Sequence, residues 1–144
     1  MIKPLTALDI DKILDVQEGF TDGWNKEMMI SAFNEKNFFA LGKFFGDTLV
    51  GFITVMTAID SADLETVVVS PNFRKQGVAT ALIKSAEDML KNMGVKDFFL
   101  EVRVGNSPAI NTYIKNGFKK ISIRKKYYKD GENAIVMQKG FSYR

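Results

Sequence analysis

The spacing of hydrophobic and polar positions predicts a chain that alternates between helices and strands. Residues 75–93 carry the clearest signal, because their apolar side chains recur every three or four positions, as on one face of a helix. These side chains are Ala79, Leu82, Ile83, Ala86, Met89, Leu90 and Met93. Shorter helices are predicted over residues 7–18, after Trp24 with Asn25 as the N-cap, and over 107–118 with Ser107 as the cap.

Runs rich in β-branched and aromatic residues predict the strands between these helices. Gly46 and Asp47 separate two such runs, which is a hairpin signal. The predicted strands cover residues 2–5, 37–45, 48–59, 64–69, 97–104, 119–124 and 134–138. Because hairpins come first and strand–helix crossovers later, the order predicts one mixed α/β (α+β) domain over residues 1–144.

The composition is that of an ordinary globular protein. Its 144 residues fit one domain, and 46% of them are hydrophobic and 26% charged. No apolar run is long enough to span a bilayer, and the first residues include acidic side chains without a signal-peptide core. We therefore expect a soluble, cytoplasmic protein with no membrane partner.

Two residue types that the sequence lacks limit its chemistry. The chain has no cysteine and no histidine, which excludes disulfides, thiol nucleophiles, Cys/His zinc sites and any Ser–His or Cys–His pair. An enzyme with this sequence must take its acid and base from Asp, Glu, Tyr, Lys, a chain terminus or water. The net charge of +3 is too small to predict nucleic-acid binding by itself.

The segment "SPNFRKQGVAT", residues 70–80, connects a predicted strand to the longest predicted helix. Pro71 ends the strand, and Gly77 can adopt a positive φ and let a ligand approach the backbone. Unpaired N–H groups at the helix start suit a phosphate, and Arg74 and Lys75 add positive charge. A plain strand-to-helix connection with solvated cations explains the same residues. The lack of a G-x-G-x-x-G motif and of a Walker lysine argues against a dinucleotide or nucleoside triphosphate site.

Four ordered motifs resemble the GNAT superfamily of N-acetyltransferases. "VVVSPNFRKQGVATALI" resembles its acyl-CoA signature R/Q-x-x-G-x-G/A, here Arg74, Gly77 and Ala79. "LEVRVGNSPAINTYIKNGF", "RKKYY" followed by "NAIVM", and "GWN" resemble segments of the RimI-type ribosomal-protein alanine N-acetyltransferases. The resemblance implies a single domain with a mixed, mostly antiparallel central sheet, splayed strands and about four flanking helices.

The resemblance also implies acetyl-CoA as co-substrate, with no metal. The backbone of residues 75–80, beside Arg74, would hold the pyrophosphate. These residues are Lys75, Gln76, Gly77, Val78, Ala79 and Thr80. Val67, Val68 and Val69 would run beside the pantetheine arm, and an N–H of Val69 or its neighbour would polarise the thioester carbonyl. Asn106 would contact acetyl-CoA; its alternative role is that of a loop or helix-cap residue.

Glu101 is the predicted general base. Strand alternation in "FFLEVRV" places Phe99, Glu101 and Arg103 on one face, and a carboxylate on a covered central strand is costly unless it is paired or used. The superfamily has its base at this position. The alternatives are a buried Glu101–arginine pair or a strand-end position that faces solvent. Glu65 and Asp63 on the preceding strand are the reserve candidates.

Tyr113 is the predicted general acid. It lies seven residues after Asn106, two helical turns along the same face, and the resemblance implies that it protonates the leaving CoA thiolate. A phenol is a suitable donor, and no histidine competes for the role. The alternative is an aromatic side chain that only holds its helix to the sheet.

The sequence says least about the acceptor, the substrate that would receive the acetyl group. Trp24, Tyr127 and Tyr128 would line a groove for a peptide N-terminus, as the resemblance implies, or belong to ordinary packing. "DAIVM" of the RimI-type enzymes is here "NAIVM", so Asn133 replaces a carboxylate. Three functions stay open: an acetyltransferase for the N-terminal alanine of a ribosomal protein, an acetyltransferase for a small amine or other metabolite, and a non-catalytic acyl-CoA-binding module or ribosome-associated factor.

Overall fold

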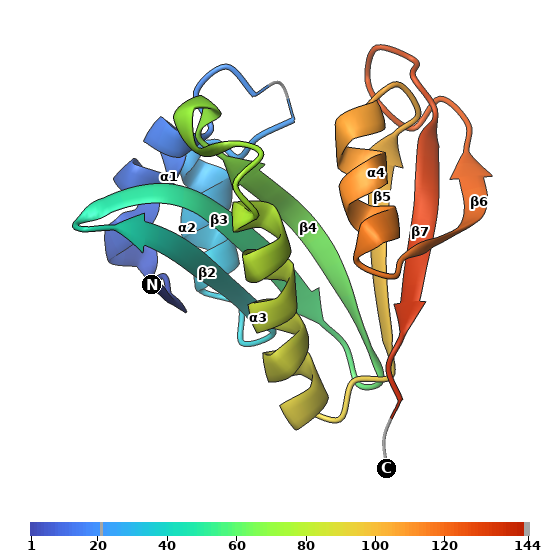
Figure 1. Ribbon diagram of the computed structural model, residues 1–144, viewed down its shortest axis with the longest axis horizontal. Coiled ribbons are helices and arrows are strands. Elements are labelled where there is room, and N and C mark those ends of the chain that lie inside the picture. Colours follow the sequence, from blue (N-terminus) through green and yellow to red (C-terminus); the bar gives the residue numbers. More distant parts are fainter. Residues whose placement is uncertain (21, 143–144) are drawn as a thin grey trace.

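A computed structural model describes residues 1–20 and 22–142. One seven-stranded sheet has the order β1-β2-β3-β4-β5-β7-β6, with helices on its faces (Figure 1). The strands are β1 (Ile2–Pro4), β2 (Phe38–Phe45), β3 (Thr48–Thr57), β4 (Ser61–Val69), β5 (Asp97–Arg103), β6 (Lys119–Arg124) and β7 (Ala134–Gly140). The helices are α1 (Ile10–Val16), α2 (Lys26–Phe33), α3 (Val78–Asn92) and α4 (Ser107–Lys115), with short 3-10 turns at Ala7–Asp9 and Pro71–Phe73.

Strands β1 to β4 form an antiparallel half that is covered on both faces. On one face, side chains of α1 and α2 such as Ile13 and Met29 pack with Phe52 of β3. On the other face, Leu82 and Ala86 of α3 pack with strand residues of β3 and β4. Burial on both faces explains why these strands read as nearly continuous apolar runs.

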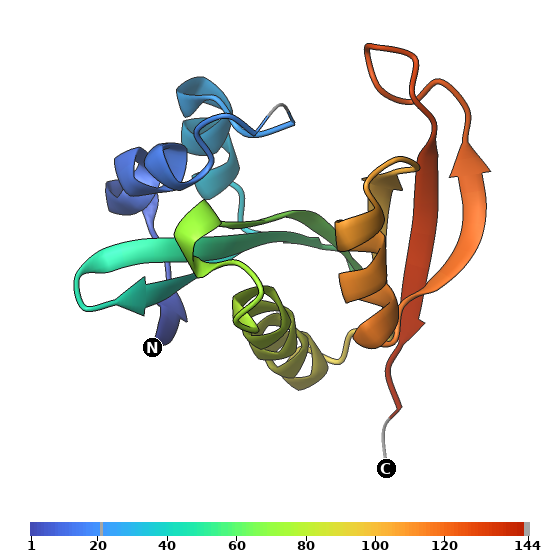
Figure 2. The ribbon, with the colours of Figure 1, turned by 45° about the horizontal axis from the view of Figure 1, so that its top comes forward.

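Strands β5, β7 and β6 form a second antiparallel half, and α4 lies on one of its faces. Ile110 and Tyr113 of α4 belong to the same core cluster as Phe98 and Leu100 of β5. The opposite face carries polar side chains, including Glu101. The expectation that β5 would be covered on both faces is therefore wrong, because α1 and α2 lie only over the other half of the sheet (Figures 1 and 2).

The two halves meet along β4 and β5, the only parallel pair of neighbours in the described sheet. Their pairing covers only Ser61–Leu64 against Asp97–Leu100, after which the strands diverge (Figure 1). The register between β3 and β4 shifts at the same level, because Val55 pairs with Leu64 whereas Thr54 pairs with Thr66. Glu65 is thus the extra residue of a β-bulge, which bends a strand locally. The prediction of a mixed, mostly antiparallel sheet with splayed strands and four helices is confirmed.

The helix boundaries differ from the sequence prediction in small, explicable ways. Helix α3 begins at Val78 rather than at residue 75, because Lys75 and Gly77 have positive φ values of 61° and 81°. Asn25 caps α2 as predicted, with its side chain accepting from the Met28 N–H. The predicted cap of α4 was wrong: Ser107 is its first residue, and the N-cap is Asn106. Among the described residues, no helix is both long and apolar enough to cross a membrane.

Candidate active site

Beyond Leu64 and Leu100 the strands β4 and β5 no longer pair, and the region between them is called the wedge. The unpaired edge of β4 borders this wedge. The Ser70 N–H donates to the Val50 carbonyl of β3, at 2.8 Å. Because successive peptide groups of a strand point in opposite directions, the N–H groups of Val67 and Val69 face the wedge. The side chains of Val67 and Val69 pack toward the α3 side. The Val68 side chain instead lies in the core under α1 and α2, so only its backbone follows the wedge.

The loop between β4 and α3 presents backbone groups at the mouth of the wedge. The Arg74 guanidinium donates through Nε to the Val69 carbonyl at 3.1 Å, which ties the loop to the end of β4. Gly77 is the N-cap of α3 and supplies no side-chain cap, so the first N–H groups of the helix, on Val78, Ala79 and Thr80, have no intrahelical acceptor. A Cβ on Gly77 would project into open space. These features fit a phosphate group of CoA.

Asn106 lies across the wedge from this loop, at the start of α4. Its side-chain oxygen accepts from the Ala109 N–H at 3.3 Å. The helix-cap role that the sequence left open is therefore present in the structure. A contact of the same side chain with acetyl-CoA stays a prediction.

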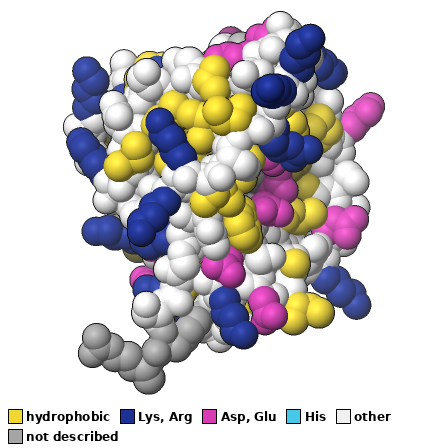
Figure 3. All heavy atoms as spheres, turned by 90° about the vertical axis from the view of Figure 1, so that its right-hand side faces the viewer, with side chains coloured by type: hydrophobic (Ala, Val, Ile, Leu, Met, Phe, Trp, Pro, Cys, Tyr) yellow, Lys and Arg dark blue, Asp and Glu magenta, His cyan; other side chains and the backbone are white. Residues whose placement is uncertain are grey.

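Three carboxylates gather on the polar face of the wedge. Burial raises the pKa of Asp63, and the negative charge of Glu101 raises it further. Burial likewise raises the pKa of Glu65, with added repulsion from Asp63 and Glu101. The side of the molecule that β6 borders shows acidic side chains among hydrophobic ones, with lysines and arginines around them (Figure 3). A group of negative charges beside an open strand edge suits a cationic amine.

Glu101 itself is part-exposed and paired. Its Oε2 accepts from the Arg124 guanidinium at 2.9 Å, and 30% of the Glu101 side chain is exposed. The sequence left open a buried pair or a solvent-facing position, and the structure combines a pair with partial exposure. Partial exposure leaves the carboxylate reachable by a substrate amine or by water.

Tyr113 is nearly buried between α4 and the sheet. Its ring packs edge-to-face on Phe118 with centroids 5.9 Å apart, and only 7% of the residue is exposed. Burial raises the pKa of its hydroxyl well above the ordinary value of 10, with a smaller contribution from Tyr128. The hydroxyl is protonated at neutral pH, as a proton donor must be, and burial makes it a weaker acid than an exposed phenol. The structure also gives the ring the packing role that the sequence left open.

Tyr127 and Tyr128, in the loop between β6 and β7, lie beside this face. Their rings pack edge-to-face at 5.1 Å, and Arg124 lies 4.5 Å from the Tyr127 ring centroid. Burial raises the pKa of Tyr127, and the negative charge of Glu101 raises it further. Burial also raises the pKa of Tyr128 to about 12, with a further increase from Asp22.

Trp24 approaches the same region from the segment before α2. Its indole N–H donates to the Thr66 hydroxyl at 3.0 Å, directly after the bulge in β4. The Gln17 side chain accepts from the Trp24 N–H at 2.9 Å and donates to the Trp24 carbonyl. Trp24 is thus fixed at both backbone and ring, against the strand that forms the wedge.

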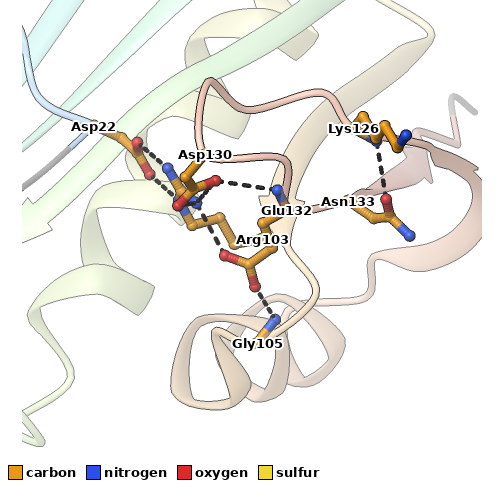
Figure 4. A network of polar contacts seen from close by, with 7 residues as sticks. All are labelled: Asp22, Arg103, Gly105, Lys126, Asp130, Glu132 and Asn133. Atoms are coloured by element: carbon orange, nitrogen blue, oxygen red, sulfur yellow. Dashed lines mark hydrogen bonds and ion pairs between the residues drawn. The ribbon is translucent and has the colours of Figure 1, made fainter.

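Sequence reasoning missed an ion-pair network around Arg103, at the end of β5 (Figure 4). Arg103 was placed on the face of Glu101 but was given no role. Its guanidinium contacts Asp22 from the segment before α2, and Asp130 and Glu132 from the β6–β7 loop. The partners lie 81, 27 and 29 positions away along the chain. The sequence showed only an arginine two positions after Glu101, the predicted base.

The family comparison agrees with this geometry. The sequence profile described as "Acetyltransferase (GNAT) family" matches residues 10–118. The chain belongs to this family. Membership confirms the predicted class of reaction, acetyl-CoA-dependent N-acetylation, and it favours an enzyme over a non-catalytic module. Within the described residues, no group of three or more His, Cys, Asp or Glu side chains is arranged to hold a metal ion.

Two relatives and one solved structure match along almost the whole chain. One from Bacillus subtilis, named a putative [ribosomal protein bS18]-alanine N-acetyltransferase, is 31% identical and the match covers 94% of this chain and 92% of that protein. One from Haemophilus ducreyi, named a [ribosomal protein bS18]-alanine N-acetyltransferase, is 30% identical over 95% and 97%. The crystal structure of the Escherichia coli ribosomal-protein-S18-alanine N-acetyltransferase superposes with a TM-score of 0.91 and 27% identity, over 100% of this chain and 95% of that one.

Proposed function

We propose that this enzyme acetylates the N-terminal α-amine of a protein, and that a ribosomal protein beginning with alanine is the first acceptor to test. The end-to-end similarity to enzymes named for that reaction carries this proposal. The geometry supports it, because the polar face of the wedge combines carboxylates with the two tyrosines of an exposed loop. Such a surface suits a charged amine followed by a short extended peptide.

On the donor side, the proposal assigns the pyrophosphate to the backbone of residues 75–80 and the pantetheine arm to the free edge of β4. The N–H of Val69 or Val67 would donate to the thioester oxygen as negative charge develops on it. Arg74 is already bonded to the Val69 carbonyl, so its part is to hold the loop in place and to add positive charge nearby. Asn106 would contact acetyl-CoA with the part of its amide that does not cap α4.

On the acceptor side, Glu101 would accept a proton from the ammonium group, directly or through a water molecule. Arg124 is bonded to Oε2, which leaves Oε1 as the accepting atom. The neutral amine nitrogen would then form a bond to the acetyl carbon and lose its second proton to water, the carbon–sulfur bond would break, and a proton from water would restore the Tyr113 phenol after it has protonated the thiolate. Tyr113 would give its hydroxyl proton to the departing thiolate. Trp24, Tyr127 and Tyr128 would hold the first residues of the acceptor.

The decisive experiment offers three kinds of acceptor to the purified protein with acetyl-CoA. They are peptides that begin with alanine, the same peptides with a blocked N-terminus and an internal lysine, and a panel of small amines. We expect mass spectrometry to find one acetyl group on the free α-amine of the first set. Acetylation of small amines alone would contradict the proposal and assign the enzyme to metabolite acetylation.

A further inference from the structure

Arg103 holds together three segments that are remote in sequence. Its Nε and Nη2 donate to the two carboxylate oxygens of Asp22 at 2.6 and 2.8 Å. Its Nη1 donates to Asp130 at 2.8 Å and to Glu132 at 2.9 Å. The guanidinium carbon also lies 4.0 Å from the centroid of the Tyr128 ring. One side chain at the end of β5 thus ties the segment before α2 to the β6–β7 loop (Figure 4).

The network differs from an ordinary surface ion pair. An isolated exposed pair contributes little, but bidentate arginine contacts within a network are stronger and more directional. Only 19% of the Arg103 side chain is exposed. The hydrogen bonds that it donates to its carboxylate partners, to Asp22 first, raise the pKa of Arg103 above its ordinary value. Removal of this cation would leave Asp22, Asp130 and Glu132 to repel one another.

Glu132 extends the network to the start of α4. Its Oε2 accepts from the Gly105 N–H at 2.8 Å, while its Oε1 accepts from Arg103. A Cβ on Gly105 would lie 2.8 Å from that same oxygen, so a side chain at this position would push the carboxylate away. The β6–β7 loop is therefore fastened both to the end of β5 and to the turn before Asn106.

A continuous series of contacts leads from Arg103 to the predicted base. Arg103 stacks on Tyr128, Tyr128 packs against Tyr127, Tyr127 lies under Arg124, and Arg124 pairs with Glu101. Each step joins groups within about one side-chain length. The Arg103 guanidinium thus lies at one end of this series and the predicted base at the other, with the two tyrosines between them.

We propose that Arg103 is a positioning residue for the acceptor. It holds the tyrosine loop and the Asp22–Trp24 segment together, and so forms the wall against which the acceptor amine is presented to Glu101. The proposal rests on the proposed function of this face as the acceptor site. It predicts a specific kinetic pattern, because the donor loop at residues 74–80 makes none of the contacts just described.

The test compares Arg103→Met with wild type, using the acceptor that wild type acetylates best, whether peptide or small amine. Arg103→Met keeps an unbranched apolar chain but loses every polar contact. We expect the KM for the acceptor to rise about tenfold or more, and the acetyl-CoA dissociation constant to stay within about twofold of wild type. Arg103→Lys keeps the charge but loses the bidentate geometry, and we expect an intermediate KM.

Lys139→Met supplies the matched control. Lys139 pairs with the buried carboxylate of Glu87 at 2.9 Å, between β7 and α3, and has no contact with the Arg103 network. The Lys139→Met variant removes a part-buried ion pair with a single carboxylate from the same half of the sheet. We expect a lower Tm with an unchanged acceptor KM, which separates loss of stability from loss of positioning.

Asp22→Asn keeps the test decisive if Arg103→Met does not fold, since it removes one carboxylate and leaves the cation in place. We expect the KM for the acceptor to rise in this variant too, but by less than in Arg103→Met.

Amide hydrogen exchange provides a readout that needs no acceptor: residues 126–132 should exchange faster in Arg103→Met and at the wild-type rate in Lys139→Met. An unchanged acceptor KM together with unchanged exchange would overturn the role of Arg103. Failure of wild type to acetylate peptides would instead overturn only the proposed acceptor class.

Discussion

On the α3 side of the wedge the proposed site consists of backbone groups, whereas on the β5 side it consists of side chains. The proposed donor side would depend on two positive φ angles, a helix N-terminus and a free strand edge. The proposed acceptor side would depend on carboxylates, tyrosines and arginines from β4, β5, the β6–β7 loop and the segment before α2. A site made of backbone groups can be encoded in one short motif, whereas a site made of side chains forms only when several segments that are distant in sequence fold close together.

The largest expected effect is on the acceptor side. Glu101→Gln keeps the size and the hydrogen-bonding ability of the side chain but removes its ability to accept a proton. We expect the turnover number to fall by roughly two to four orders of magnitude, as for loss of a general base. Steady-state rates at saturating acetyl-CoA and acceptor measure this. An unchanged turnover number would mean that Glu65, Asp63 or bulk water, and not Glu101, accepts the proton.

A second large effect is expected at Tyr113, on α4. Tyr113→Phe retains the ring that packs on Phe118 and removes only the hydroxyl. We expect turnover to fall by about a hundredfold, while the acetyl-CoA dissociation constant and the Tm stay close to wild type. Turnover, calorimetric binding and thermal unfolding of the same preparation test this. Full activity would mean that the thiolate leaves without help from this phenol.

The donor side is expected to respond to the backbone. Gly77→Ala places a methyl group where a phosphate would approach and disfavours the positive φ of 81°. We expect the acetyl-CoA dissociation constant to rise about tenfold and the Tm to fall by about 3 °C. Gly94→Ala is a matched control, because Gly94 has a φ of 80° and open space around a Cβ, but lies at the far end of α3. Gly94→Ala should lower the Tm by a similar amount and leave the acetyl-CoA dissociation constant unchanged.

The smallest expected effect tests the electrostatics of the carboxylate group. The pKa of Glu65 is raised, so its ionised form is less favourable in the folded than in the unfolded protein. Glu65→Gln should therefore raise the Tm at pH 7, by only about 1 °C because solvent screens the site. The gain should disappear as the pH falls below the ordinary carboxyl pKa of 4.5, where Glu65 is protonated in both states. A gain that grows at low pH would contradict this assignment.

The same contrast explains what the sequence could predict. Helix α3, the strands of the covered half and the turn at Gly77 follow from local periodicity and backbone conformation, and the structure has them nearly where they were expected. The general position of Glu101 follows from strand alternation. The position of its partner Arg124 does not. Arg124 is on β6, which lies two strands from β5 in the sheet because β7 lies between them, and that strand order cannot be predicted from local pattern.

The Arg103 network could not be predicted from the sequence for the same physical reason. Its distances depend on how the segment before α2 and the β6–β7 loop fold back over the sheet, and no local pattern encodes that approach. The N-cap of α4 was misplaced by one residue because Ser107 and Asn106 are both good capping residues, and only the backbone angles decide between them.

The most direct test of the account is the affinity for acetyl-CoA, measured by calorimetry in Gly77→Ala and in Glu101→Gln under identical conditions. If the donor site is made by the backbone of residues 75–80 and the base lies on the acceptor side, the dissociation constant should rise about tenfold in the first variant. It should match wild type in the second. Equal affinity in all three proteins, or a loss in Glu101→Gln alone, would contradict the division of the wedge into a backbone-built donor side and a side-chain-built acceptor side.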